Sequence, residues 1–334
     1  MANTTIYDVA GAAKVSLATV SRVMNNPEKV NPETREKVLK AIKELGYRPN
    51  AIAKGLASRK TTTVGIIVSD ISRAATSQLV GGIIDIAQKY DYAVKLFSMD
   101  GESDKKEVMR RVVAEQVDGI LFLNDELNPE EMELVLNHIQ DAQIPVVLCN
   151  ACYEEKSIPS VAIDYEQATY DVTNKLLSSG KKKVFFATTT HRYAINGRKL
   201  AGYEKAMKEA GLEANIVRTS GDVPINTLHF TELLKNNEIE ALIAVRDSIA
   251  VSFINVAISA GYKVPDNIEV VGLQNTKYAI LSRPNLTCVD CPVYDIGAVS
   301  MRLLTKIMKN EEVTENNILL PYRLVLRKTT KDIK

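Results

Sequence analysis

Histidine and long apolar runs are both scarce in this chain. The three histidines, His138, His191 and His229, are scattered and show no metal-ligand spacing. No apolar run approaches the roughly 18–20 residues that a membrane-spanning helix needs. Residues 1–16 are polar and lack the apolar segment and small-residue cleavage site of an export signal, which favours the cytoplasm.

Motifs of catalysis are also absent from the sequence. It contains no P-loop, no nucleophile elbow and no metal-ligand pair, so we expect neither an enzyme nor a bound cofactor. The four cysteines form two C-x-x-C pairs, Cys149 with Cys152 and Cys288 with Cys291. Two such pairs can bind zinc or form a redox switch. Neither pair has a Gly-rich knuckle and Cys149 ends an apolar run, which favours small buried hydrophobic residues instead.

Length and charge indicate a basic N-terminal segment followed by a larger acidic part of the chain. The 334 residues are 46% hydrophobic and 25% charged, as in ordinary globular proteins, and suit two or three packed units. Residues 1–60 hold 11 Lys/Arg against 5 Asp/Glu, whereas the rest of the chain holds 31 against 36. Such an asymmetry is typical of a phosphate-binding module attached to a sensor.

Capping signals predict three short helices in the first sixty residues. Thr5 with Asp8 has the spacing of a capping box, so a helix should begin at Ile6. Ser16 can cap a second helix over residues 17–25, and Asn31 before a proline opens a third that stops at Gly46. Three short helices with a tight turn between the first two form a helix-turn-helix unit.

The second helix of such a unit enters the DNA major groove. Arg22 is the side chain on it that can form a bidentate pair with guanine, while Leu17 and Ala18 offer apolar contacts to thymine methyl groups. A three-helix bundle with a solvated Arg22 is the alternative. Six further residues are candidates for phosphate contacts that set the register: Thr5, Tyr7, Ser16, Thr19, Ser21 and Asn25.

The runs IYDVA at 6–10, VSLATVSRV at 15–23 and GYRPNA at 46–51 resemble the lactose/galactose repressor family. In that family the segment after Pro-Asn is a hinge helix, here about residues 50–58, which enters the minor groove and wedges a leucine between base pairs. The matching DNA-contact positions are Tyr47, Asn50, Ala53 and Leu56. A flexible basic linker is the alternative for this segment.

From residue 64 onward, apolar strand-like runs alternate with helical patterns. This alternation predicts an α/β fold with two doubly wound parallel-sheet subdomains and a ligand cleft between them. The family resemblance implies the same core, similar to periplasmic sugar-binding proteins, with chain crossings near residues 161, 290 and 322. We therefore expect a DNA-binding domain at 1–60, an N-subdomain at 61–161 and 291–321, and a C-subdomain at 162–290 and 322–334.

The cleft residues depart from those that the family uses for small effectors. The first loop, residues 70–76, lacks the family's aromatic residue, and Lys199 stands at the family's arginine position. Gln274 replaces an aspartate, and an amide oxygen accepts sugar hydroxyls more weakly than a carboxylate. The residues that remain candidates for a small ligand such as a phosphosugar are Ser69, Asp70, Asp164, Lys199 and Gln274.

A second resemblance points to a protein effector. Residues 294–299 and 301–306 resemble the catabolite-control branch of the family in Gram-positive bacteria, whose effector is the phosphocarrier protein HPr phosphorylated on serine. The positions carried over are Tyr294, Asp295, Val299, Arg302, Lys306 and Arg323. Arg302 and Lys306 share a helix face and could form a cationic fork for phosphoserine, although a solvated amphipathic helix has the same spacing.

Three functions are compatible with these patterns. The first is a homodimeric regulator of catabolite-control type on a pseudo-palindromic operator, activated by phosphorylated HPr. The second is a local sugar-operon repressor controlled by a small sugar or phosphosugar in the cleft. The third, a sugar-transport protein, is disfavoured by the helix-turn-helix and the missing export signal.

Overall fold

The computed structural model describes residues 4–47, 61–153, 158–191 and 193–331. The chain divides into two compact units, Met1–Thr61 and Thr62–Lys334. Each unit has a hydrophobic core of its own, and each is described by itself below. The hinge segment predicted at about 50–58 lies outside the described residues.

The N-terminal unit contains the three predicted helices. They are α1 (Ile6–Ala13), α2 (Leu17–Asn25) and α3 (Pro32–Glu44), with a 3₁₀ turn, η1 (Pro27–Lys29), before the third. The Thr5 hydroxyl accepts from the Asp8 amide, and the Asp8 carboxylate accepts from the Thr5 amide, which completes the capping box. Ser16 caps α2 through the Thr19 amide, and Asn31 caps α3 through the Glu33 amide. The predicted helix starts are therefore confirmed.

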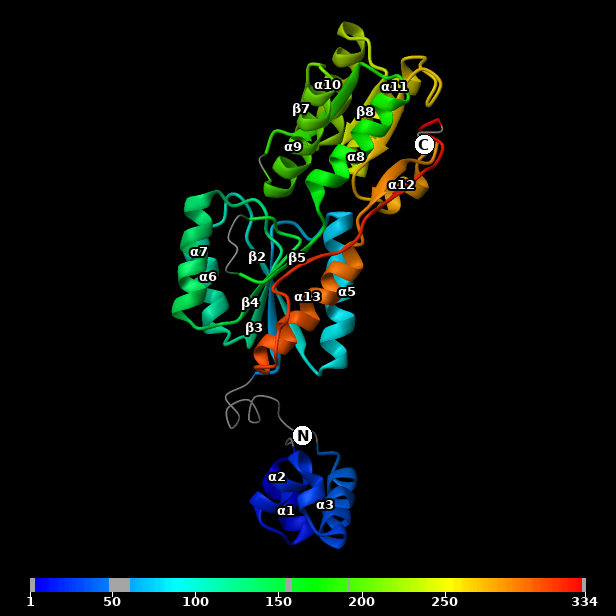
Figure 1. Cartoon of the computed structure of the whole chain (residues 1–334). Helices are drawn as coiled ribbons and strands as arrows, with labels where there is room; N and C mark the ends of the chain where they lie inside the picture. Colours follow the sequence, from blue (N-terminus) through cyan, green and yellow to red (C-terminus); the bar gives the residue numbers. More distant parts are fainter. Residues whose placement is uncertain (1–3, 48–60, 154–157, 192, 332–334) are drawn as a thin grey trace. The chain divides into compact units, whose positions relative to one another are not determined.

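The first sheet of the larger unit has the strand order β11-β5-β4-β3-β1-β2, with every pairing parallel. Its strands are β1 (Thr63–Val68), β2 (Ala93–Ser98), β3 (Gly119–Phe122), β4 (Val146–Cys149), β5 (Ser160–Ala162) and β11 (Asn317–Leu319). Its helices are α5 (Ala74–Lys89), α6 (Lys105–Ala114), α7 (Pro129–Asp141) and α13 (Val293–Met308). Helices α5 and α13 cover one face, and α6 and α7 cover the other (Figure 1). We call this layered body the N-lobe.

The second sheet has the order β12-β10-β9-β8-β6-β7. Its strands are β6 (Val184–Thr189), β7 (Asn215–Thr219), β8 (Ala241–Ala244), β9 (Glu269–Gly272), β10 (Thr287–Asp290) and β12 (Arg323–Val325). Its helices are α8 (Tyr165–Ser178), α9 (Ala194–Glu209), α10 (Val223–Asn236), α11 (Asp247–Ser259) and α12 (Lys277–Leu281). We call this body the C-lobe.

The chain passes between the two sheets after β5, after β10 and after β11. Both sheets are doubly wound, which confirms the predicted α/β class. The sheets differ from the expectation at one edge, because β12 pairs with β10 in the antiparallel direction. This short strand follows directly on the last crossing, so it meets its neighbour from the opposite end. Among the described residues, no helix is both long and apolar enough to span a lipid bilayer.

Candidate DNA-binding surface and interlobe cleft

Helix α2 presents one cationic side chain, Arg22, on its exposed face. Val20 and Val23 are buried in the core of the N-terminal unit, which turns Leu17, Ala18 and Arg22 outward into solvent. The Ser16 cap also places its hydroxyl 2.9 Å from that of Thr19 at the start of the helix. An exposed guanidinium on this helix suits the bidentate recognition of guanine.

The other predicted DNA contacts lie around this helix or outside the described residues. Tyr7 is 68% exposed on α1, and Thr5 is exposed at its N-terminus, whereas Tyr47 packs partly against the core of the unit. Ser21 is half-buried. Three predicted contacts, Asn50, Ala53 and Leu56, and the side chain of Asn25 lie outside the description.

Helix α13 gathers most of the predicted effector positions on one exposed face. Tyr294, Asp295, Arg302 and Lys306 are exposed and Val299 is half-buried, while Leu303 and Leu304 pack into the core. Arg323 is also exposed, but it comes from β12, where its Nε donates to Asp290 Oδ2 at 2.8 Å. The Tyr294 hydroxyl donates to Asp85 of α5, which joins the two helices of this face.

Three of the five residues predicted to hold a small ligand bond to other groups of the protein. Lys199 is 2% exposed, and its Nζ donates to the carbonyl oxygens of Val245 at 3.0 Å and Leu273 at 3.4 Å. Burial lowers its pKa. Asp164 caps α8 through the Gln167 amide, and Asp70 accepts from Ser72. Ser69 and Gln274 are half-buried.

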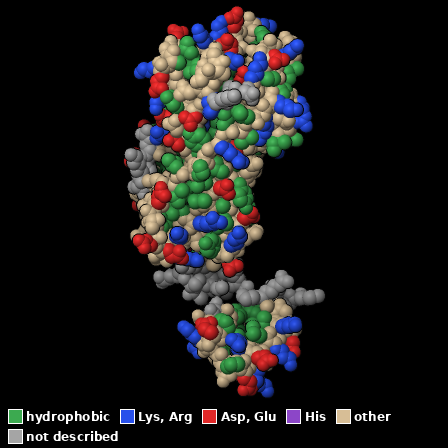
Figure 2. All heavy atoms as spheres, turned by 45° about the vertical axis from the view of Figure 1, so that its right-hand side comes forward, with side chains coloured by type: hydrophobic (Ala, Val, Ile, Leu, Met, Phe, Trp, Pro, Cys, Tyr) green, Lys and Arg blue, Asp and Glu red, His purple; other side chains and the backbone are tan. Residues whose placement is uncertain are grey.

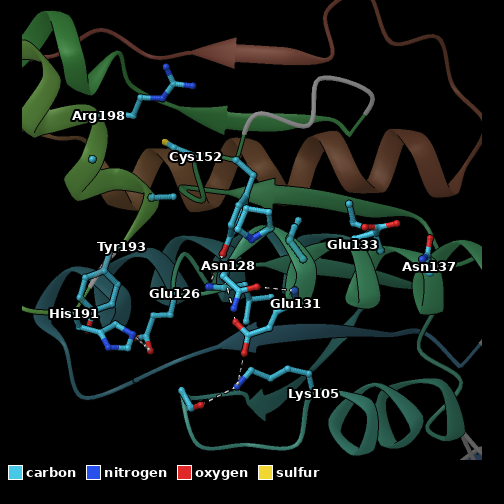
Figure 3. Close-up of a pocket in the computed structure, with 18 of the residues that line it drawn as sticks. Lys105, Glu126, Asn128, Glu131, Glu133, Asn137, Cys152, His191, Tyr193 and Arg198 are labelled. Carbon is cyan, nitrogen blue, oxygen red and sulfur yellow. Dashed lines mark hydrogen bonds and ion pairs between the residues drawn. The ribbon is translucent and has the colours of Figure 1, made fainter.

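The cavity that opens between the lobes is lined by different residues. Its volume is about 1160 Å³, and it lies between α7 of the N-lobe and α9 of the C-lobe (Figure 3). Four carboxylates, Glu126, Glu131, Glu133 and Glu166, line it against two cations, Lys105 and Arg198. Lys105 is 8% exposed, and its ammonium is held by three backbone carbonyls. None of the five residues predicted for a small ligand is among those that line it.

Arg73 fills the side of the cleft where the first loop faces the C-lobe. Its Nη2 donates to Glu126 Oε1 at 2.9 Å and to the Tyr193 hydroxyl at 2.8 Å. The Arg73 side chain is 26% exposed and that of Glu126 only 7%. Tyr193 comes directly before α9, so this arginine of the N-lobe contacts the C-lobe. Sequence patterns identified the unusual loop but not its partners Tyr193 and Glu126, because nothing in the local sequence shows that these residues meet.

Asp125, the residue before Glu126, has an unusual acidity. Loss of solvent raises its pKa to about 6, and the neighbouring charges of Arg73 and Arg246 only partly oppose this effect. The folded protein therefore takes up a proton near pH 6 that the unfolded chain, with an ordinary aspartate, takes up near pH 4. The stability that this group contributes is fully present below about pH 4 and is lost as the pH rises through 6.

We accordingly expect Asp125→Asn to reduce the pH dependence of unfolding. Between pH 5 and 7, the wild type should lose about 1 kcal/mol through this group, and the variant should not. Urea unfolding at the two pH values measures the difference. Asp222→Asn, which alters a helix-capping aspartate of α10, is the control and should retain the wild-type slope over that interval. An unchanged slope in Asp125→Asn would contradict the raised pKa.

The cysteines are free and mostly buried. Cys149, Cys288 and Cys291 are buried, and Cys152 is half-buried. Burial raises the pKa of each thiol, to about 12 for Cys149, Cys152 and Cys291, which disfavours the thiolate that metal binding and redox chemistry require. Cys288 is within 3.6 Å of Asp247 and Cys291 within 3.5 Å of the Leu273 carbonyl oxygen. Across the described part of the chain, no group of three or more metal-ligating side chains is assembled.

A helix-turn-helix unit followed by a two-lobed core defines a class of bacterial regulators. Residues 5–50 match the model of bacterial regulatory proteins of the lacI family. Residues 61–328 match the periplasmic binding proteins and sugar-binding domain of the LacI family. The chain therefore belongs to the LacI family, and it is a DNA-binding transcription regulator and not an enzyme.

Its relatives include several catabolite control proteins. Catabolite control protein A of Priestia megaterium is 42% identical over 335 residues, which cover 98% of this chain and all of that protein. The protein of that name from Staphylococcus xylosus is 39% identical over 98% of this chain and 99% of its own. The transcription regulator CcpA of Lactococcus lactis is a structural neighbour, with a TM-score of 0.71 and 30% identity over 80% of this chain and 99% of its own.

The lac repressor dimer bound to its operator and an anti-inducer has the same fold. Its TM-score is 0.89, with 25% identity over 98% of this chain and 99% of that one. The resemblance to the lactose/galactose repressor family is thus confirmed, as is the similarity to its catabolite-control branch.

Proposed function

We propose that this regulator acts in carbon catabolite control, as a cytoplasmic homodimer that binds a pseudo-palindromic operator and is activated by serine-phosphorylated HPr. The observation that carries the proposal is a contrast between two surfaces. The cationic face of α13 is open to solvent, whereas three of the candidate ligand positions, Lys199, Asp70 and Asp164, are engaged by the protein's own groups. The catabolite control proteins among its relatives support the same assignment.

The chemistry of the α13 face suits a phosphoserine. Arg302 and Lys306 are four positions apart, so both side chains extend from one helix face. A guanidinium binds a phosphate in bidentate fashion, and an adjacent ammonium adds charge. Val299, one turn before, offers an apolar contact beside them. A phosphorylated protein surface could therefore pair its phosphate with Arg302 and Lys306 and place an apolar side chain against Val299.

Exposed apolar side chains support a dimer. Helix α11 packs against both α10 and α12, and these neighbours carry large hydrophobic side chains at the surface. The most exposed are Val223, Leu228, Ile280 and Leu281, at 60–72%. Figure 2 shows a further gathering of hydrophobic side chains in the lower half of the larger unit, at the height of the N-lobe in Figure 1 and apart from α10 and α12. Burying such residues against a second copy would match the two half-sites of a symmetric operator.

A sugar-operon repressor is the second candidate, because the cavity of about 1160 Å³ is large enough for a small effector. Its lining argues against a phosphosugar, however. Four glutamates outnumber the two cations, one of which, Lys105, is held by backbone carbonyls and lies 3.6 Å from Glu131. A neutral sugar would be compatible with this lining.

The charge reversal Arg302→Glu tests the proposed effector. We expect phosphorylated HPr to lose its stimulation of operator binding by tenfold or more, about 1.4 kcal/mol, while DNA binding without it is unchanged. Operator affinity is measured by fluorescence anisotropy with and without phosphorylated HPr. Lys208→Glu reverses an exposed charge on α9 and is the matched control.

Retained stimulation in Arg302→Glu would place the effector elsewhere. Titration calorimetry with phosphorylated HPr and with a panel of sugars and sugar phosphates distinguishes the two candidates. Heat from a sugar together with no heat from phosphorylated HPr would favour the local repressor.

A further inference from the structure

Tyr193 lies between two arginines that come from different lobes. Arg73, which precedes α5 of the N-lobe, has its guanidinium carbon 4.8 Å from the centre of the Tyr193 ring. Arg246 precedes α11 of the C-lobe, and its guanidinium carbon also lies 4.8 Å from the centre of the Tyr193 ring. A guanidinium at this distance from an aromatic ring is attracted to its π electrons. The tyrosine therefore shares its ring between a cation of each lobe.

Two further contacts join the same segments of the lobes. The amide of Ala194, the first residue of α9, donates to the Asp125 carbonyl oxygen at 2.9 Å. His191 Nε2 lies 3.6 Å from Glu126 Oε2. Figure 3 shows these two side chains facing each other. Asp125 and Glu126 follow β3 of the N-lobe, whereas His191 and Ala194 belong to the C-lobe. The contact between the lobes is thus built from side chains and backbone together.

The charges in this contact are balanced mostly from within the N-lobe. Arg73 Nε lies 3.3 Å from Asp70 Oδ2, and its Nη2 bonds Glu126, so the guanidinium is anchored to its own lobe at two points. From there it reaches across to the Tyr193 hydroxyl. A bridging ligand in a two-lobed protein does the same, since it hydrogen-bonds both lobes at once. Arg73 differs from such a ligand because it is part of the protein chain.

We propose that Arg73 is a built-in cleft ligand, which holds the two lobes of the core together without any small effector. This connection needs no ligand because the group that bridges the lobes is always present at the cleft. A sugar could enter this side of the cleft only by displacing Arg73 from Tyr193 and Glu126. This inference does not depend on which protein or small molecule regulates DNA binding.

Hydrogen exchange at the Ala194 amide gives a direct test. The first amides of a helix have no partner within it, so protection of this amide reports its bond to Asp125 across the cleft. In the full-length protein, Arg73→Ala should accelerate exchange at Ala194 about tenfold or more, because local opening sets the rate. The Ile66 amide in the centre of β1 should retain wild-type protection. Methylguanidinium, which resembles the deleted group, should restore slow exchange at Ala194.

Two variants complete the test. Arg110→Ala removes an exposed arginine of α6 whose ion pair is with Glu107 of the same helix, and it should leave Ala194 unchanged. Tyr193→Leu removes the hydroxyl that accepts from Arg73 and the aromatic ring beside it. This variant provides the test if Arg73→Ala loses protection throughout the core. Selective acceleration at Ala194 in either variant supports the proposal. Wild-type protection there in Arg73→Ala, or in a folded Tyr193→Leu, would overturn it.

Discussion

Replacing Arg22 by alanine is expected to weaken operator binding by about 1–3 kcal/mol for each half-site, a loss of roughly 5- to 150-fold per half-site. The guanidinium is exposed on α2 and can pair with the O6 and N7 atoms of a guanine. Since each half-site of a symmetric operator would lose one such pair, base preference should relax at the same position in both halves. Binding-site selection followed by anisotropy titration measures both effects.

Two variants separate base reading from charge. Arg22→Lys keeps the charge but not the fork of donors, so it should lose base preference while retaining the salt dependence of binding. Lys37→Ala removes an exposed cation of α3 that pairs with Glu33, and should leave base preference unchanged. If Arg22→Ala selects the same sequences as the wild type, Arg22 does not read bases.

The N-terminal helices could be predicted closely because their signals are local. A capping side chain and the amide that it accepts are two or three residues apart, so Thr5, Ser16 and Asn31 mark helix starts in the sequence itself. The strands of the two lobes were recognisable for a similar reason. Those at the centre of each sheet, such as β3 and β8, are short fully buried runs of apolar residues.

The edges of the sheets could not be predicted in this way. Strands β11 and β12 are three residues long and lie partly or fully in solvent, and the apolar runs at 318–320 and 324–326 are too short to mark a strand by themselves. Their positions are set by the crossings of the chain between the lobes, which depend on the whole fold. The antiparallel direction of β12 has the same origin.

The cleft shows most clearly what sequence patterns leave out. Comparison with the family identified what was missing, namely the aromatic residue of the first loop and the aspartate at Gln274. It could not identify the replacement, because Arg73, Glu126, Tyr193 and Arg246 are dozens of residues apart and meet only in the folded core. Lys199 illustrates the same limit, since its family position suggested a ligand contact and its ammonium binds backbone carbonyls instead.

The close packing of α5 on α13 predicts a large difference between two adjacent glycines. A β-carbon at Gly82 would lie 2.0 Å from the Tyr294 carbonyl oxygen, which no side-chain movement can relieve. Gly82→Ala should therefore force the two helices apart and cost about 3 kcal/mol of stability. A β-carbon at Gly81 would meet nothing within 4 Å. Gly81→Ala should stabilise the protein by about 0.5–1 kcal/mol, because alanine favours helix over glycine.

Thermal unfolding of the full-length protein compares the pair directly. Because the substitution and the helix are the same, the difference between the two variants isolates the contact between α5 and α13. We expect the unfolding midpoint of Gly82→Ala to fall by about 5–10 °C and that of Gly81→Ala to rise by a few degrees. Since Tyr294 begins the α13 face, Gly82→Ala should also weaken any stimulation by phosphorylated HPr, whereas Gly81→Ala should not. Equal midpoints for the two variants would mean that the helices are not in backbone contact at Gly82.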